Sequence, residues 1–178
     1  KFFGTSSFNV AGYLHAVGAV RDSINFVPYQ DDSHWGGIHC SHDDWAKSIT
    51  LSYFTIKNAG LDNSNYAALT VRDRRNHDGV NISHGDISGS AGTGLSLLHN
   101  NNDYNMEWSS IEVSNVDVHH SQHDWAVRTY YNYNSNLTLD SLHIHSNERG
   151  LAIESQYYPC NLNITNCTIE SSDYEEVR

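Results

Sequence analysis

Two short segments of the chain carry side chains of the types that can bind metal ions and exchange protons. They are Asp117-Val118-His119 and His143-Ile144-His145, each with its polar groups two residues apart. Imidazole and carboxylate groups are suitable ligands for Zn²⁺ or Cu²⁺, and imidazoles in general change charge near pH 6.5. If the two segments lie side by side, Asp117, His119, His143 and His145 are predicted to form a divalent-metal site or a pH-sensitive patch. The alternative is a solvated polar face in a chain with 12 histidines.

An internal repeat determines whether these segments meet. Five stretches of eight residues align without a gap, and they begin at Ile49, Val80, Ile111, Leu137 and Leu162. Each reads apolar, polar, apolar, two small or polar residues, apolar, polar, apolar. Alternation with period two predicts a strand with one buried face, and the two-residue break predicts a corner. A period of 25–31 residues is typical of a solenoid.

A second, shorter strand is predicted after each of the first four repeats and once before them. These strands occupy residues 37–40, 68–71, 94–97, 126–129 and 150–153. The predicted fold is therefore all-β: a single-stranded parallel β-helix of about six turns. We expect one domain over 1–178, with opening turns at 1–48 and regular turns at 49–178, and we expect it to be a module of a longer chain.

Stacking of the turns in this register creates two outward columns about one strand spacing, roughly 4.8 Å, from turn to turn. The first column holds Thr55, Asp86, Asp117, His143 and Thr168, and the second holds Lys57, Ser88, His119, His145 and Glu170. The three imidazoles and the carboxylate of the two metal-binding segments are thus predicted to share one patch.

Four segments of the first third of the chain resemble the opening of the pectin-lyase-like superfamily. They are residues 8–18, residues 22–26, Trp35-Gly36-Gly37-Ile38, and the Asn-Ala-Gly ending at Gly60. The resemblance implies a right-handed β-helix over nearly the whole chain. That superfamily includes polysaccharide lyases, glycoside hydrolases, phage tailspikes and non-enzymatic surface modules. The Trp-Gly-Gly-Ile style is similar to that of the surface β-helix modules of bark beetle-like proteins.

A possible enzymatic motif is incomplete. Residues 76–80, Asn-His-Asp-Gly-Val, resemble the Asn-Thr-Asp-Gly strand of polygalacturonases, and Ser83-His84-Gly85 resembles their Gly-His-Gly. The family's Asp pair does not follow downstream, and there is no Arg-Ile-Lys segment. We therefore predict no catalytic residues, and leave activity open with a preference for none.

Composition excludes two classes of partner. The formal net charge is −11, and the basic residues Arg72, Arg74 and Arg75 are interrupted by Asp73, so no basic stripe for nucleic acid is expected. No apolar run approaches the roughly 18 residues of a membrane span.

Four sequons predict the compartment: Asn81, Asn136, Asn163 and Asn166 each begin an Asn-x-Ser/Thr triplet. They predict a secreted or cell-surface protein with N-linked glycans. Of the three cysteines, Cys160 and Cys167 are candidates for a disulfide; the alternative is that the inward-facing Cys40 and Cys167 fill the core as free thiols.

Aromatic residues and the two ends of the solenoid predict partners. Loop tyrosines could bind a glycan or a protein, or could stack on one another as ladders: Tyr130, Tyr131, Tyr133, Tyr157 and Tyr158. Phe2 and Phe3 are expected to cover the first turn, whereas the last turn has no evident cap. We therefore predict an extracellular structural or adhesive module that self-associates end to end or in tandem. The alternative is a carbohydrate-binding module, or a polysaccharide lyase or glycoside hydrolase.

Overall fold

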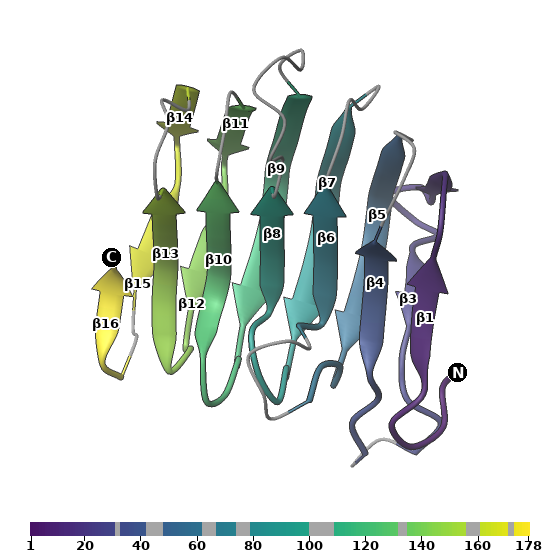
Figure 1. The fold of residues 1–178 in the computed structure, drawn as a ribbon. Coiled ribbons are helices and arrows are strands. Elements are labelled where there is room, and N and C mark those ends of the chain that lie inside the picture. The colour runs from purple at the N-terminus through teal and green to yellow at the C-terminus, as the bar shows by residue number, and fades with distance from the viewer. Residues whose placement is uncertain are drawn as a thin grey trace.

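The protein is a parallel β-solenoid, as the repeat predicted. The computed structural model describes residues 1–30, 33–41, 48–61, 67–73, 79–99, 109–131, 135–155, 161–170 and 173–178. Within these ranges every regular element is a strand, and successive coils stack side by side along one axis (Figure 1). No helix among the described residues is long and apolar enough to cross a membrane.

One sheet contains a strand from each of seven successive passes of the chain. All of its strand pairs are parallel. Its order is β1 (Ser7–Val10), β4 (Gly37–Ser41), β6 (Leu69–Asp73), β8 (Leu95–His99), β10 (Trp125–Tyr131), β13 (Arg149–Ser155) and β16 (Glu175–Val177). These strands include the short second strands that were predicted after each repeat.

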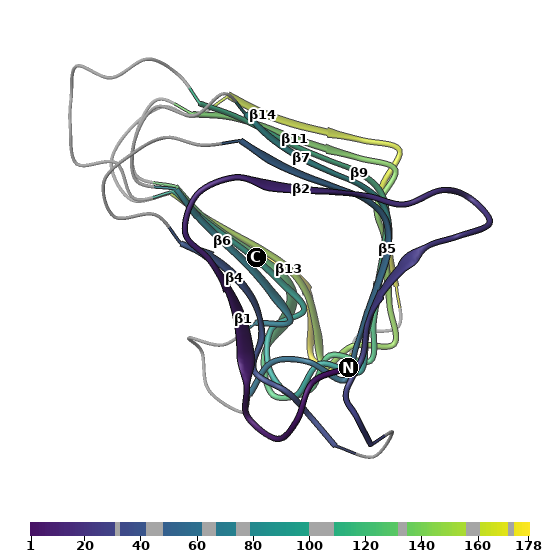
Figure 2. The same cartoon turned by 90° about the vertical axis from the view of Figure 1, so that its right-hand side faces the viewer.

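The repeats themselves form the second sheet, which also consists of parallel pairs. Its main path is β14 (Asn161–Thr165), β11 (Ser135–Asp140), β9 (Ser109–His119), β7 (Val80–Ser88), β5 (Ile49–Lys57) and β2 (Leu14–Val17). Three short strands pair with the second halves of the long ones or with each other: β3 (Ile24–Phe26), β12 (His143–His145) and β15 (Thr168–Glu170). The sheet therefore bends, and Figure 2 shows a three-sided cross-section.

The bend lies at one repeat position, where the backbone is left-handed in each of the five repeats. Its φ is between 51° and 54° at Tyr53, His84, Asn115, Ser141 and Asn166. A left-handed conformation costs most non-glycine residues roughly 1–2 kcal/mol, and asparagine and histidine tolerate it better than most. A second left-handed corner follows five residues later at Asn58, Gly89, His120 and Ser146. Corners at fixed repeat positions keep the coils in register.

The inward side chains form columns that fill the space between the faces. Leu51, Ile82, Val113 and Leu139 follow one another from coil to coil and are all fully buried. Large and small residues alternate where space is short. Phe54 lies beside Gly85, and a Cβ added to Gly85 would come within 2.2 Å of the phenyl ring. The core is therefore one continuous stack of interlocking side chains.

The two described cysteines lie in or against this core. Burial raises the pKa of the Cys40 thiol to about 12, so this side chain is an uncharged part of the core. The half-buried Cys167 thiol donates hydrogen bonds to the carbonyl oxygens of Thr165 (3.3 Å) and Leu139 (3.5 Å). It has no disulfide partner within the described part of the chain. Cys160 lies outside the described residues, so the predicted Cys160–Cys167 disulfide stays a prediction.

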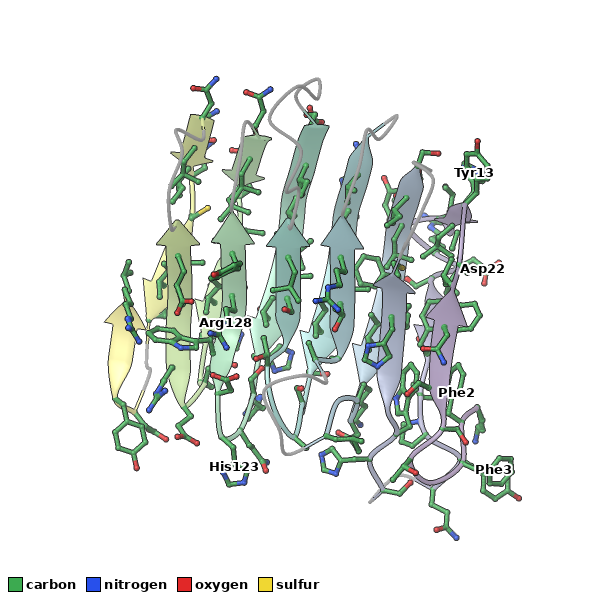
Figure 3. The ribbon with its side chains drawn as sticks, in the orientation of Figure 1. Phe2, Phe3, Tyr13, Asp22, His123 and Arg128 are labelled. Atoms are coloured by element: carbon green, nitrogen blue, oxygen red, sulfur yellow. The ribbon has the colours of Figure 1, made fainter. Side chains whose placement is uncertain are left out.

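Aromatic rings cover the N-terminal coil only in part. Phe2 stacks on the buried Trp35 with ring centroids 4.0 Å apart, and the Trp35 indole donates to the carbonyl of Lys57. Phe3 does not share this role, because it is 63% exposed and stacks on Tyr29 at the outside of the coil (Figure 3). The prediction that both phenylalanines cover the first turn holds for Phe2 alone.

The stacked core predicts the effect of one core truncation. Leu139→Ala removes a fully buried side chain from an inward column, and such truncations cost about 2–5 kcal/mol of unfolding free energy. Guanidinium unfolding followed by circular dichroism measures the loss. Glu112→Ala, at an exposed outward position on the adjacent strand β9, is the matched control and should change stability by less than about 0.5 kcal/mol. Equal effects of the two variants would contradict this assignment of inward and outward faces.

Candidate functional site

The structure brings the two predicted metal-binding segments together on the outer surface. Strand β12 pairs with the second half of β9, so that His143 lies beside Asp117 and His145 beside His119. On the adjacent coils, Asp86 in β7 lies beside Asp117, and Glu170 in β15 lies beside His145. We call Asp86, Asp117, His119, His143 and His145 the histidine–aspartate ladder. Its register is the one that the repeat alignment predicted.

Asp117 lies at the centre of the ladder. Its Oδ1 atom is 3.1 Å from Nε2 of His145 and 3.6 Å from Nδ1 of His143. This oxygen is buried and has no hydrogen bond of acceptable geometry, although the side chain as a whole is 39% exposed. Two ring nitrogens thus approach a carboxylate oxygen without a hydrogen bond to it.

The opposite nitrogens of these two rings have partners of their own. His143 Nε2 lies 3.2 Å from a carboxylate oxygen of Glu170, and His145 Nδ1 lies 3.1 Å from the hydroxyl of Ser146. The two imidazoles also stack, with centroids 4.4 Å apart. Each ring therefore has a polar partner at the nitrogen farther from Asp117, and these contacts orient the other nitrogen toward the Asp117 side.

His119 extends the ladder toward the N-terminus of the chain. Its ring stacks on His145 at 5.0 Å, and its Nε2 atom lies 3.2 Å from Oδ2 of Asp86. Its Nδ1 atom is 2.6 Å from Nδ1 of His120. If His119 Nε2 donates its hydrogen to Asp86, then Nδ1 must accept one from His120. Asp86, Ser88 and His120 thus form a second polar group beside Asp117, with Ser88 donating to Asp86.

The ladder contains two triads of ligand atoms that lie within 4.8 Å of one another: Asp117 with His143 and His145, and Asp86 with Asp117 and His119. The four residues predicted from the sequence are all in these triads. Asp86 belongs to the predicted outward column but had not been assigned to the site. The arrangement can chemically hold a divalent metal ion, because it offers imidazole nitrogens and carboxylate oxygens at one point of the surface.

Asn147 supports the ladder from inside the solenoid, and sequence reasoning missed it. Its side-chain amide is buried; it donates to the carbonyls of Val118 (2.9 Å) and His145 (2.8 Å), and accepts from the amide of Ser121 (2.8 Å). It therefore ties β9 to β12 where their histidines lie side by side. The available signal was its place in a repeat column of otherwise small residues, Ala59, Ser90 and Ser121.

The four sequons differ in their surroundings. Asn81 and Asn163 are exposed on outward strand positions of β7 and β14. Asn136 is half-buried and accepts a hydrogen bond from Asn161. Asn166 lies at the left-handed corner, where its amide donates to Asp140 at 2.9 Å. The outward placement of Asn81 and Asn163 leaves room for N-linked glycans, whereas a glycan on Asn166 would have to displace its contact with Asp140.

The predicted tyrosine surface lies mostly outside the described residues, which include neither Tyr133, Tyr157 nor Tyr158. Tyr130 is half-buried on β10, and the backbone of Tyr131 continues the same strand. Of the two residues that resembled a polygalacturonase site, the structure describes only His84. His84 stacks on Tyr53 at a corner, and Asp78 lies outside the described ranges. The glycan-binding and enzymatic alternatives remain predictions.

Comparisons with protein-family models, with curated proteins and with solved structures find no match for this chain. The geometry of the ladder and of the two end coils therefore carries the functional argument.

Replacing Asn147 tests its structural role. In Asn147→Leu three backbone groups lose their buried partner, and each unsatisfied buried group costs roughly 1–3 kcal/mol. We expect a clear loss of unfolding free energy in guanidinium titration, whereas Asn81→Leu, at an exposed position, should change it little. Stability of Asn147→Leu equal to that of the wild type would rule out the tie between β9 and β12.

The last coil predicts a response to acid. Hydrogen bonds from the hydroxyl of Thr165 (2.6 Å), the amide of Asn166 (2.9 Å) and the hydroxyl of Ser141 (3.3 Å) lower the pKa of the Asp140 carboxyl. A carboxyl with a lowered folded-state pKa stabilises the fold above its unfolded pKa of about 3.9, and this contribution is lost as pH falls through the lowered value.

Melting temperatures at several pH values test this response. Asp140→Asn should lower the melting temperature at pH 7, and the difference from the wild type should shrink as the pH falls below about 4. Asp22→Asn, at an exposed position of the first coil, is the matched control and should leave the pH profile unchanged. A wild-type–variant difference that is constant with pH would contradict the role of the ionised carboxylate.

Proposed function

We propose that this protein is an extracellular structural or adhesive module whose solenoid stacks end to end with further copies of itself. One observation carries the proposal. Among the described residues, every large apolar side chain with high exposure lies in the first coil or the last: Phe3, Phe8, Tyr13, Val17, Val20, Tyr29, Leu162, Ile164, Tyr174 and Val177. The coils between them expose no such side chain within the described ranges.

The last coil repeats the inward pattern without being covered. Leu162 is in register with Leu137, and Ile164 with Leu139. Leu137 and Leu139 are 1% and 0% exposed, whereas Leu162 and Ile164 are 40% and 41% exposed. Sequence position and register are equivalent, and the exposure differs because β14 is the outermost strand of its sheet in the described structure, with no described coil on its far side. A docked coil would remove these side chains from water at about 25 cal/mol per Å² of apolar surface.

The strand edges at the two ends are complementary. Strands β14, β15 and β16 each pair on one side only, and so do β1, β2 and β3 at the other end. An unpaired edge can accept another strand through its free backbone groups. Docking the first coil of one copy on the last coil of another would continue all three faces in parallel. A head-to-tail contact of this kind need not close, and it would therefore build a filament.

The extracellular part of the proposal is supported by the sequons and by the sequence resemblance. Asn81 and Asn163 point outward, away from both the core and the ladder, so glycans there are compatible with the fold. The resemblance to the pectin-lyase-like superfamily, and in style to its non-enzymatic surface modules, favours a role at a cell surface or in a matrix.

Sedimentation velocity over a concentration series tests the stacking. The wild-type chain should form species that grow with concentration, and electron microscopy should show them as linear rows. Leu162→Lys combined with Ile164→Lys should yield monomers, because two charges then occupy the docking face. Glu112→Lys, at an exposed outward position away from both ends, should associate like the wild type.

Two results would overturn the stacking proposal. One is a monodisperse wild-type monomer at high concentration; the other is unchanged association of the double lysine variant. A monomer that instead binds polysaccharide in a saturable manner would favour the carbohydrate-binding alternative.

A further inference from the structure

We propose that Asp117, His143 and His145 bind one divalent transition-metal ion of the Zn²⁺ class on the outer face of the solenoid. This site is separate from the apolar end faces, and it does not depend on whether the protein stacks. Three observations carry it: the partner at the opposite nitrogen of each ring, the spacing of the ligand atoms, and the buried oxygen of Asp117 that has no hydrogen-bond donor.

The partners of the two rings are compatible with neutral tautomers whose lone pairs lie on the nitrogens near Asp117. Glu170 lies 3.2 Å from His143 Nε2 and can accept a hydrogen from it, and the hydroxyl of Ser146, 3.1 Å from His145 Nδ1, can accept one from that atom. In these neutral tautomers, His143 Nδ1 and His145 Nε2 carry lone pairs, and these two atoms lie 3.6 and 3.1 Å from Oδ1 of Asp117. Three lone pairs repel one another unless a cation lies between them.

The alternative to a cation is an ordinary ion pair, in which the rings donate to Asp117. Contacts of 3.1 and 3.6 Å are within reach of an ion pair. However, neither contact meets the distance and angle requirements of a hydrogen bond, and Oδ1 of Asp117 is buried without any hydrogen-bonded donor. A buried carboxylate oxygen that lacks donors costs free energy. A bound cation would satisfy that oxygen and both nitrogens together.

Two of the three ligand separations agree with those of a zinc centre, and all three ligand atoms lie within 4.8 Å of one another. Ligand atoms at 2.0–2.1 Å from a tetrahedral ion lie about 3.3 Å apart. The two measured separations from Asp117 Oδ1, 3.1 and 3.6 Å, lie on either side of that value. The side chains of Asp117, His143 and His145 are 39%, 46% and 25% exposed. A fourth coordination position would therefore face solvent and could hold water, as in exchangeable zinc sites with three protein ligands.

The ligand types select the class of ion. Two imidazoles and one carboxylate suit Zn²⁺, Cu²⁺ or Ni²⁺, whereas Ca²⁺ and Mg²⁺ prefer six or more oxygen ligands. Glu170 and Ser146 would act as positioning residues, since each orients a ligating ring through its other nitrogen; a carboxylate behind a histidine is common at zinc sites. Asp86 and His119 lie next to the site and supply a second carboxylate and imidazole.

Isothermal titration of the metal-free protein with zinc chloride tests the proposal. We expect one saturable site in the wild type. His143→Asn and Asp117→Asn each remove a direct ligand and should weaken zinc binding by about 100-fold or more, while Glu170→Gln should weaken it by about 10–100-fold, as other outer partners do. Calcium chloride at the same concentration should not compete with zinc.

His123→Gln is the matched control. His123 lies on the turn before β10, where it is 59% exposed and has its own carboxylate partner, Glu148, at 3.9 Å (Figure 3). Zinc binding should be unchanged in this variant. Far-UV circular dichroism of all variants should match the wild type, because the ladder lies on the surface and outside the core.

Three outcomes would overturn the metal site. The first is the absence of saturable zinc binding by the wild type. The second is wild-type affinity in His143→Asn and Asp117→Asn. The third is an equal loss in His123→Gln, which would show binding by scattered surface histidines. None of these results bears on end-to-end association, which is measured without metal.

Discussion

The whole structure depends on the parallel pairing of each coil with the next in a fixed register. Backbone hydrogen bonds between coils set that register along the strands, and the left-handed corners set it around the cross-section. The corner at Tyr53, His84, Asn115, Ser141 and Asn166 recurs at one repeat position with nearly the same φ. If one corner shifted by a residue, every side chain beyond it would exchange its inward position for an outward one. Buried columns such as Leu51 to Leu139 make that exchange costly.

The same register places chemistry on the surface. A residue on one coil meets its repeat equivalents on the two adjacent coils, so three coils together bring Asp86, Asp117 and His143 into one column. Asn147 then holds the two strands that carry the histidines. The same register explains the apolar surface of the last coil. Leu162 and Ile164 occupy inward positions, but no described coil packs against them. The surface site and the exposed apolar side chains of the last coil are thus two consequences of one stacking pattern.

The repeat predicted the fold and the backbone of the ladder, because period-two alternation and repeat alignment together specify which residues become neighbours. The repeat could not predict contacts that depend on the direction of a side chain. The alignment placed Asp117 beside His143, but it could not show that Glu170 and Ser146 occupy the opposite nitrogens. Asn147 was missed because its three hydrogen bonds are to backbone groups, so its place in a column of small residues indicated an unusual position but not these partners. Phe3 was misjudged because nothing in a terminal segment indicates which of two adjacent rings turns inward.

The central claim is that coil register assembles a metal-binding triad from residues on two adjacent strands. Anomalous diffraction at the zinc absorption edge, from crystals grown with zinc chloride, tests it most directly. We predict one strong peak about 2.0–2.2 Å from Asp117 Oδ1, His143 Nδ1 and His145 Nε2, with Asp117 paired to His143 across the coils. A well-ordered ladder with no peak, or a peak at other side chains, would contradict the account.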